Sequence, residues 1–123
     1  MEFLRATGSP VCARLRGLIR HAEVATTEVV MMELLAGARD ASHLKSLRGL
    51  LLGCSLVTAH GLSDYEAAAA IYRRCRARGE TIRALTDCLV AGIAIREGLP
   101  VLHADADFEA IARHTDLVTA QAA

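Results

Sequence analysis

The feature that most constrains the fold of this chain is the alternation of short apolar segments with longer helical ones. Four short segments have the aliphatic and β-branched composition of strands, and one or two helical segments separate each from the next. Strands joined in this way need crossover connections, which favour a mainly parallel sheet. The pattern predicts strands over residues 23–26, 55–59, 100–103 and 117–120, and helices over residues 10–21, 28–37, 41–52, 64–78, 84–97 and 106–114. We therefore expect a three-layer α/β domain.

Polar and glycine residues mark the expected helix ends. Thr27 and Asp40 precede apolar helical segments as N-caps, and Ser63–Glu66 has the form of a capping box. Gly79 and Gly98 follow the last periodic residues of two helices, where glycine commonly ends a helix. The leucines expected to face the core from helix 41–52 are Leu44, Leu47 and Leu51.

Length and composition exclude several classes of protein. With 123 residues, 53% of them hydrophobic, the chain suits one folded domain and is neither disordered nor long enough for two ordinary domains. Its apolar runs are too short to span a membrane. The first ten residues lack the apolar region of a secretory signal, so we expect a cytoplasmic protein. A formal net charge of zero argues against binding nucleic acid by bulk charge alone.

The four cysteines show no metal-binding spacing. Cys12, Cys54, Cys75 and Cys88 stand far apart, and the histidines form no zinc-like pairs with them. We therefore expect reduced cysteines and no zinc site.

Two acidic residues occupy apolar helical segments, where an ionised carboxylate is costly. Glu33 lies within VVMMELLAGA, and Asp87 lies in a segment without another formal charge between Arg83 and Arg96. Asp87 shares a helix face with Val90, Ala91 and Ala94, which we expect to be buried. Each acid has a structural alternative: Glu33 as a carboxylate at the helix end or rim, and Asp87 as the partner of an arginine such as Arg83 or of backbone amides.

The segment HADADF adds two more acids directly after a predicted strand. Asp105 and Asp107 follow His103 at the carboxyl end of that strand, where parallel α/β sheets bind ligands. Either aspartate could instead cap the following helix, and His103 could be a strand-end side chain or touch substrate. Converging carboxylates require a cation, and hard oxygen ligands select Mg²⁺ or Mn²⁺. Such a cation can activate water against a phosphodiester, which predicts metal-assisted hydrolysis.

With Glu33, Asp87 and HADADF in this order, the chain resembles the PIN-domain family, and most of all its VapC-type ribonuclease toxins from bacterial VapBC toxin–antitoxin pairs. The matching stretches are EFLRATGS, EVVMMELLAGARD, AAAIYRRCRARGETIRALTDCLVAGIAIREG and PVLHADADFEAIARHT, which cover most of the chain. The resemblance implies an acidic Mg²⁺ or Mn²⁺ site that cleaves RNA, often transfer RNA. It also implies a cognate VapB-like antitoxin that blocks this site.

The resemblance assigns roles residue by residue. Glu33, Asp87 and Asp105 match the family's catalytic and metal-binding acids, with Asp107 as a neighbour or substitute of Asp105. Thr86 matches the small polar residue beside the central aspartate, although a threonine that packs between helices is an equal alternative. Family members begin with a central strand that ends in an aspartate, and this chain lacks both before EFLRATGS. We therefore expect a single PIN-like domain over residues 1–123 that is incomplete at its N-terminus, either truncated or degenerate, with impaired activity and with dimerisation to cover exposed strand edges.

A basic stretch precedes the central aspartate. Glu80 is the only acid in it. Arg74 and Arg78 lie one helical turn apart, as do Arg73 and Arg76 approximately. The stretch predicts contacts to RNA phosphates, with an ordinary solvated helix face as the alternative. Its residues are Arg73, Arg74, Arg76, Arg78 and Arg83.

Two other functions remain open on sequence alone. A degenerate domain could bind antitoxin or RNA without cleaving, and the missing aspartate favours this interpretation. An α/β signalling domain with an acidic phosphorylation pocket is less consistent, because it needs a lysine on a late strand and Lys45, the only lysine, lies in a predicted helix.

Overall fold

A five-stranded parallel sheet forms the centre of the protein. The computed structural model describes residues 2–4, 24–103 and 106–121. Within these ranges the strand order is β3-β2-β1-β4-β5, and every neighbouring pair is parallel. The α/β class and the parallel sheet are thus confirmed. The strands are β1 (Glu2–Leu4), β2 (Val24–Thr26), β3 (Ser55–Leu56), β4 (Val101–His103) and β5 (Thr119–Gln121).

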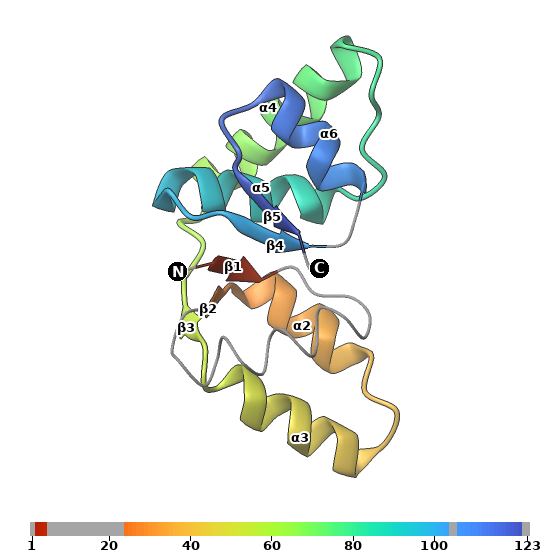
Figure 1. Cartoon of the computed structure of the whole chain (residues 1–123), viewed down its shortest axis with the longest axis vertical. Helices are drawn as coiled ribbons and strands as arrows, with labels where there is room; N and C mark the ends of the chain where they lie inside the picture. The colour runs from red at the N-terminus through yellow and green to blue at the C-terminus, as the bar shows by residue number, and fades with distance from the viewer. Residues whose placement is uncertain (1, 5–23, 104–105, 122–123) are drawn as a thin grey trace.

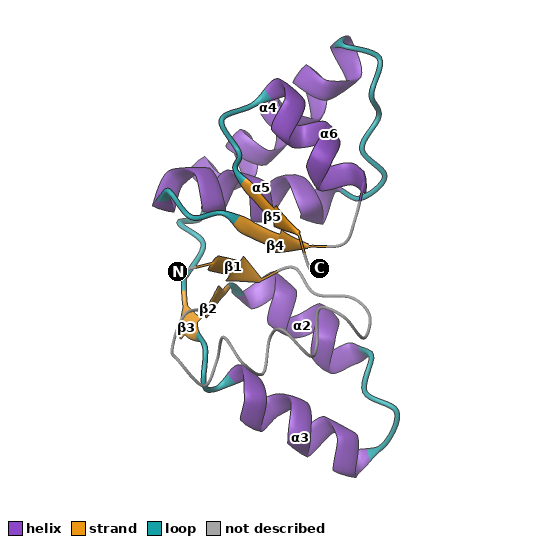
Figure 2. Cartoon of the chain, viewed as in Figure 1, coloured by secondary structure: helices purple, strands orange, loops and turns teal. Residues whose placement is uncertain are grey.

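Helices cover the sheet from two sides. In Figure 1, α2 and α3 lie beside the half of the sheet that contains β2 and β3, and the other described helices lie beside β4 and β5. Figure 2 shows the sheet as a narrow middle layer between these two groups of helices. The helices are α2 (Glu28–Ala36), α3 (Ala41–Leu51), α4 (Leu62–Ala77), α5 (Leu85–Glu97) and α6 (Ala106–His114). The helix expected over residues 10–21 lies outside the described residues.

The central position of the sheet is filled, which corrects the expectation that the first strand is missing. Phe3 of β1 pairs with Ala25 on one side and with Val101 on the other. Without β1, the facing edges of β2 and β4 would leave backbone donors and acceptors unpaired, so a strand is strongly favoured there. Three residues have no readable periodicity, and for this reason the sequence pattern did not reveal the strand.

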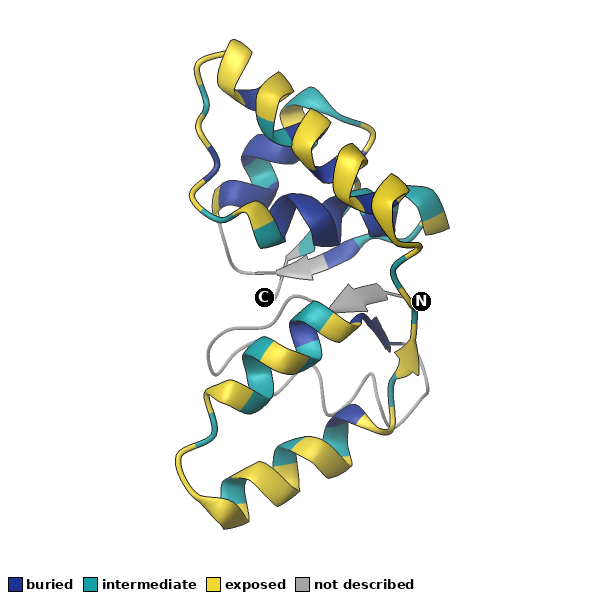
Figure 3. Ribbon diagram, turned by 180° about the vertical axis from the view of Figure 1, so that it is seen from behind, coloured by how far each residue is buried: buried dark blue, intermediate teal, exposed yellow. Residues whose placement is uncertain are grey.

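Helix α5 forms the middle of the hydrophobic core. Cys88, Val90, Ala91, Ile93 and Ala94 are all fully buried, and α5 packs against α4, α6 and α2. Figure 3 shows this helix as the most continuously buried one, whereas α3 and α4 are exposed along their outer faces. The expected burial of the face that Asp87 shares with Val90, Ala91 and Ala94 is confirmed.

Two predicted details of the helices are wrong. Gly61, with a φ of 68°, precedes α4 in place of Ser63, and the Ser63 hydroxyl donates to the carbonyl of His60 instead of capping the helix. The carboxylate of Asp64 accepts from the N–H of His60 at 2.7 Å, so the local bond runs back to the loop. In α3, Leu51 is buried but Leu44 is 42% exposed, because α3 packs mainly against α2.

Other helix ends match the sequence pattern. Asp40 accepts from the N–H of His43 at 2.8 Å as an N-cap, and Gly98 ends α5 in the left-handed conformation. Within the described residues, none of the helices combines the length and the apolarity needed to cross a membrane.

Candidate functional site

Asp87 is the most deeply buried of the predicted site residues. It lies in the first turn of α5 and is 2% exposed. The N-terminus of a helix carries partial positive charge, which stabilises a carboxylate in this position. The guanidinium of Arg83, the arginine named as the structural alternative, pairs with a second acid.

Asp107 is that acid. It lies in the first turn of α6 and is 9% exposed. Its Oδ2 accepts from the backbone N–H of Arg83 at 3.2 Å and from Nε of Arg83 at 3.3 Å. Asp107 therefore links α6 to the loop that leads into α5. Arg83, predicted as an RNA-binding residue, keeps 74% of its side chain exposed while it makes this contact.

Asp87 and Asp107 both lie near enough to Cys88 for their charges to act on its thiol. Burial, the neighbouring Cys75 and then the negative charges of Asp87 and Asp107 raise the pKa of the Cys88 thiol to about 12. The structure thus brings together two of the predicted acids at the N-terminal ends of α5 and α6. In Figure 1 both helices begin on the side of the molecule towards which β1 and β4 point.

Glu33 lies apart from this pair, on α2. Its side chain is half-buried, and its Oε1 is fully shielded from solvent. Helix α2 packs against α5, so Glu33 and Asp87 are carried by helices in contact. Across residues 2–4, 24–103 and 106–121, no three histidine, cysteine, aspartate or glutamate side chains are grouped to hold a metal ion. Asp105 and the side chain of His103 lie outside the described residues.

Thr86 faces a cavity between two helices. It is half-buried and, with Leu85 and Leu89 of α5, lines a cavity of about 210 Å³. The opposite wall comes from α4, through Tyr65, Ala68 and Ala69. This apolar lining is consistent with the packing alternative for Thr86.

The arginines of α4 form an exposed basic end that lies next to the acid-bearing end of α5. Helices α4 and α5 are antiparallel, since Gly92 lies against Ile71, and Asp64 at the start of α4 binds Arg96 at the end of α5. Residues 73, 74, 76 and 78 are all exposed. The guanidinium of Arg76 lies over the ring of Tyr72, 5.6 Å from its centroid. We call these four arginines the α4 basic end.

Sequence reasoning missed Glu28. Its Oε1 accepts from the hydroxyl of Thr27 at 2.9 Å and from the backbone N–H of Ala59 at 3.2 Å. Burial alone would raise the pKa of Glu28, but these hydrogen bonds and one from its own N–H lower it. An acid after a helix N-cap is a recognisable signal, but nothing in the sequence links it to Ala59.

The buried pair of Asp64 and Arg96 was also missed. Nη2 of Arg96 donates to Oδ2 of Asp64 at 2.9 Å, and Nε donates to Oδ1 at 3.2 Å. The same Nη2 also donates to the carbonyl of Thr58 at 3.1 Å. This two-pronged contact joins α4, α5 and the loop after β3, and its role is structural.

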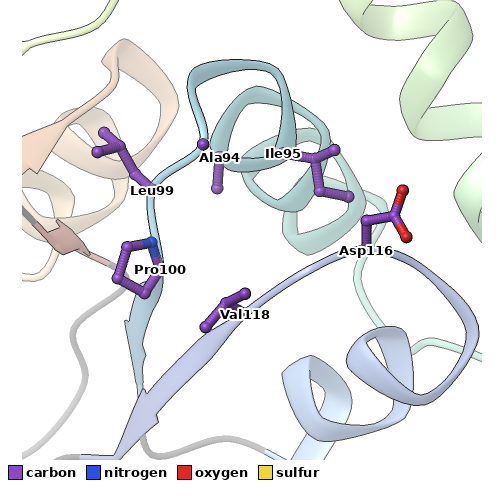
Figure 4. Close-up of a pocket in the computed structure, with 7 residues that line it drawn as sticks. Ala94, Ile95, Leu99, Pro100, Asp116 and Val118 are labelled. Carbon is purple, nitrogen blue, oxygen red and sulfur yellow. The ribbon is translucent and has the colours of Figure 1, made fainter.

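A second cavity lies at the opposite end of α5 from Asp87. It has a volume of about 370 Å³, and apolar residues make most of its wall (Figure 4). Ala94, Ile95, Gly98, Leu99, Pro100, Asp116 and Val118 line it. Asp116 is its only carboxylate, so this cavity lacks the acids that a cation site would need.

The donors at the acid end of the molecule fit a hard divalent cation. Asp87 and Asp107 offer carboxylate oxygens that are largely withdrawn from water. Mg²⁺ and Mn²⁺ prefer such ligands and keep several waters, so they do not require a closed cage of protein atoms.

Comparisons with known proteins identify the family of this chain. The model of the PIN domain family matches residues 2–114. VapC ribonuclease Mb1587 of Mycobacterium bovis is 42% identical over 98% of this chain and 91% of its own length, and Ribonuclease VapC11 of Mycobacterium tuberculosis has the same values.

Solved structures show the same fold. A chain in the crystal structure of DNA-bound VapBC from Salmonella typhimurium superposes with a TM-score of 0.73. The two chains are 14% identical, and the match covers 100% of this chain and 99% of the other. The match of the family model over nearly the whole chain, together with the two relatives, shows that this chain belongs to the PIN-domain family and, within it, to the VapC group.

Proposed function

We propose that this protein is a ribonuclease toxin of a VapBC toxin–antitoxin pair, which hydrolyses RNA phosphodiester bonds with Mg²⁺ or Mn²⁺. The observation that carries the proposal is Asp87, a carboxylate 2% exposed in the first turn of α5, beside Asp107 on α6. The relatives named ribonucleases share 42% identity with this chain across nearly its full length. Transfer RNA is the substrate class we favour.

The proposed roles follow the resemblance to the family. Asp87 and Glu33 would hold the cation, and Asp105 would complete the ligand set with Asp107 as its neighbour. When bound, the cation neutralises charge on the phosphate and activates a water molecule. Asp107 also holds Arg83 in place through its backbone N–H and its side chain. The α4 basic end grips RNA phosphates beside this site, which positions RNA without reading its sequence.

The proposed protein partner is a VapB-like antitoxin. Solved neighbours of this fold are VapBC complexes bound to DNA, from Salmonella typhimurium and Rickettsia felis. We propose that the cognate antitoxin covers the acid end of the molecule and that the toxin itself forms a homodimer in the cytoplasm.

Substitution of Asp87 tests the catalytic proposal. The variant Asp87→Asn keeps the size of the side chain but removes its charge, so we expect Mg²⁺-dependent cleavage of bulk bacterial transfer RNA to fall ~100-fold or more. Circular dichroism and thermal unfolding should show that the variant still folds. The matched control is Asp40→Asn, because asparagine also serves as an N-cap and Asp40 is exposed on another helix. Cleavage by Asp87→Asn at the wild-type rate would refute the assigned site.

A second function is favoured by one observation. The described residues contain no group of three metal-binding side chains, which is consistent with a degenerate domain that binds RNA or antitoxin without cleaving. In that case wild-type protein would retain RNA in a binding assay with Mg²⁺ but leave it intact, and Asp87→Asn would change neither result.

A further inference from the structure

The connection between α4 and α5, residues 78–84, is fastened to α6 at both ends of that helix. At the C-terminal end of α6, the carboxylate of Glu80 contacts the last two residues of the helix. At the N-terminal end, Oδ2 of Asp107 accepts from the backbone N–H of Arg83 at 3.2 Å. Between these contacts, Ile82 is 2% exposed and belongs to the hydrophobic core. The position of the connection therefore depends on what holds it to α6.

Glu80 is the one acid of the basic stretch, and its carboxylate meets two cationic side chains of α6. Its Oε1 accepts from Nη2 of Arg113, and its Oε2 lies 2.5 Å from Nε2 of His114. Only 15% of the His114 side chain and 31% of the Glu80 side chain are exposed, so the contact is partly shielded from water. Hydrogen bonds from Arg113 and then from His114 lower the pKa of Glu80. The carboxylate therefore stays charged in mildly acidic solution.

The charge of His114 determines how strongly this contact holds. Histidine ordinarily takes up its proton between about pH 8 and pH 5. A charged ring makes a stronger hydrogen bond to a carboxylate than a neutral ring does. His114 is also the last residue of α6, where the partial negative charge of a helix C-terminus favours a cation. Both effects act on the protonated ring, so acidification strengthens the contact.

The elements packed against α6 add further charged groups around this contact. These elements are α4, α5 and β5, and Thr119–Gln121 of β5 carries no titratable side chain. On α4, burial and then the charge of Glu80 raise the pKa of the Cys75 thiol, which is therefore neutral. Among these groups, histidine is the side chain that ordinarily changes charge between about pH 5 and pH 8. The charged groups nearby are Arg74 of α4, Asp87 of α5, Glu109 and Arg113 of α6, and Asp116 just after α6.

We propose that Glu80, Arg113 and His114 form a pH-sensitive clasp, which tightens the connection 78–84 on α6 as the pH falls from about 8 to about 5.5. Protonation of His114 gives the carboxylate a second cation beside the guanidinium of Arg113. The connection carries Arg83, so the clasp also restrains a residue predicted to bind RNA. The inference goes beyond the proposed function, because it requires neither a bound cation nor cleavage of RNA.

Hydrogen exchange of the full chain, read by mass spectrometry on peptides that contain residues 78–84, tests the clasp. Protection is the observed exchange rate corrected for the intrinsic rate at each pH. The variant His114→Gln can form a hydrogen bond but cannot take up a proton. We expect it to reduce protection of the connection about fivefold at pH 5.5 and less than about twofold at pH 8.

The matched control is His43→Gln on α3. Nδ1 of His43 accepts from the backbone N–H of Arg39 at 3.0 Å, a contact that protonation does not strengthen. Protection of the connection in this variant should equal that of the wild type at both pH values. Circular dichroism shows that each variant folds.

A variant of the carboxylate shows whether the effect passes through Glu80. Glu80→Gln should also lose protection at pH 5.5, and adding His114→Gln to it should cause no further loss. A further loss would overturn the clasp, because His114 would then act through another group. Equal losses in His114→Gln at both pH values would overturn the pH sensitivity, and no loss at either would remove the clasp itself.

The wild type provides a test that needs no variant. Protection of the connection, measured relative to that of the buried helix α5, should rise as the pH is lowered from 8 to 5.5. A constant or falling ratio would overturn the proposal however the variants behave.

Discussion

The two buried cysteines near the acid end of α5 lie in an environment that suppresses ionisation of their thiols. Cys88 and Cys75 are both fully buried and are free thiols. The pKa of Cys88 rises to about 12 through burial, Cys75 and the charges of Asp87 and Asp107. Burial, and the charge of Glu80 after it, also raise the pKa of Cys75. Neither residue has the low thiol pKa of a catalytic cysteine.

Alkylation measures this suppression directly. We expect Cys88 in the folded protein at pH 8 to react with iodoacetamide at least about tenfold more slowly than half-buried Cys54, because thiolate is the reacting form. Mass spectrometry of peptides taken over time gives both rates. Labelling in urea serves as the control, since both cysteines should then react alike. Equal rates in the folded protein would contradict the described environment.

The sequence indicated only some residues of the candidate site. Asp87 and Glu33 could be identified because an acid among apolar helix residues is conspicuous in any sequence. The acceptor role of Asp107 towards Arg83 depends on tertiary contact across 24 positions, which no local pattern encodes.

Helix α4 shows how one element can serve two purposes. Its inner face packs on α5 through Ala68, Ile71 and Cys75, which are buried. Its outer face carries the α4 basic end, exposed beside the acids of the candidate site. Antiparallel packing brings the C-terminal part of α4 next to the N-terminal part of α5, and this brings positive and negative groups to the same end.

Removal of two arginines tests the role of the α4 basic end. We expect Arg74→Ala with Arg78→Ala, made in an Asp87→Asn background, to weaken transfer RNA binding about tenfold and to flatten its salt dependence by one to two released counterions, roughly. Fluorescence anisotropy at several KCl concentrations provides both quantities. The double variant Lys45→Ala with Arg48→Ala removes the same charge from exposed positions on α3 and should have little effect. Equal losses in both double variants would mean that only total charge matters.

Elements were predictable where local signals were strong. The positions of α5 and α6 follow the pattern closely, because glycine ends the first and an apolar periodicity defines the second. The start of α4 was misjudged, since Gly61 and a bond from His60 to Asp64 replace the expected capping box. The same carboxylate also accepts from Arg96, 32 positions away, and no local pattern encodes that contact.

Asp64 and Arg96 join α4, α5 and the loop after β3. Burial alone would raise the pKa of Asp64, but the hydrogen bonds from Arg96 and His60 and the charge of Arg96 lower it. A lowered pKa in the folded state means that the charged form favours folding. The contribution of this charge to stability is therefore complete above the unfolded pKa of about 3.9, and it is lost as the pH falls through the folded pKa.

Urea unfolding between pH 3 and pH 7 measures this contribution. We expect Asp64→Asn to be less stable than the wild type by about 3 kcal/mol at pH 7, because it leaves Arg96 with an incomplete partner. The gap should narrow below about pH 4, where the wild type loses the charge of Asp64. Asp116→Asn removes an exposed acid and is the control. A gap that stays constant with pH would show that the pair contributes no linked charge.

At the scale of the whole molecule, the sequence predicted the class of fold but not the middle of the sheet. The alternation of strands and helices runs through the whole chain, so errors at single element boundaries do not change the predicted fold class. The central strand β1 has three residues, and its pairing with β2 and β4 depends on segments remote in sequence. Only the three-dimensional arrangement of β2 and β4 shows where β1 lies.

The placement of β1 also affects how the protein is made. Phe3 pairs with Val101, so the contact that joins the two halves of the sheet waits until nearly the whole chain has left the ribosome. Glu33 belongs to the first half, whereas Asp87 and Asp107 belong to the second. A nascent chain therefore carries its acids in separate, unjoined parts. The acids of the candidate site can therefore come together only after the second half of the sheet has formed.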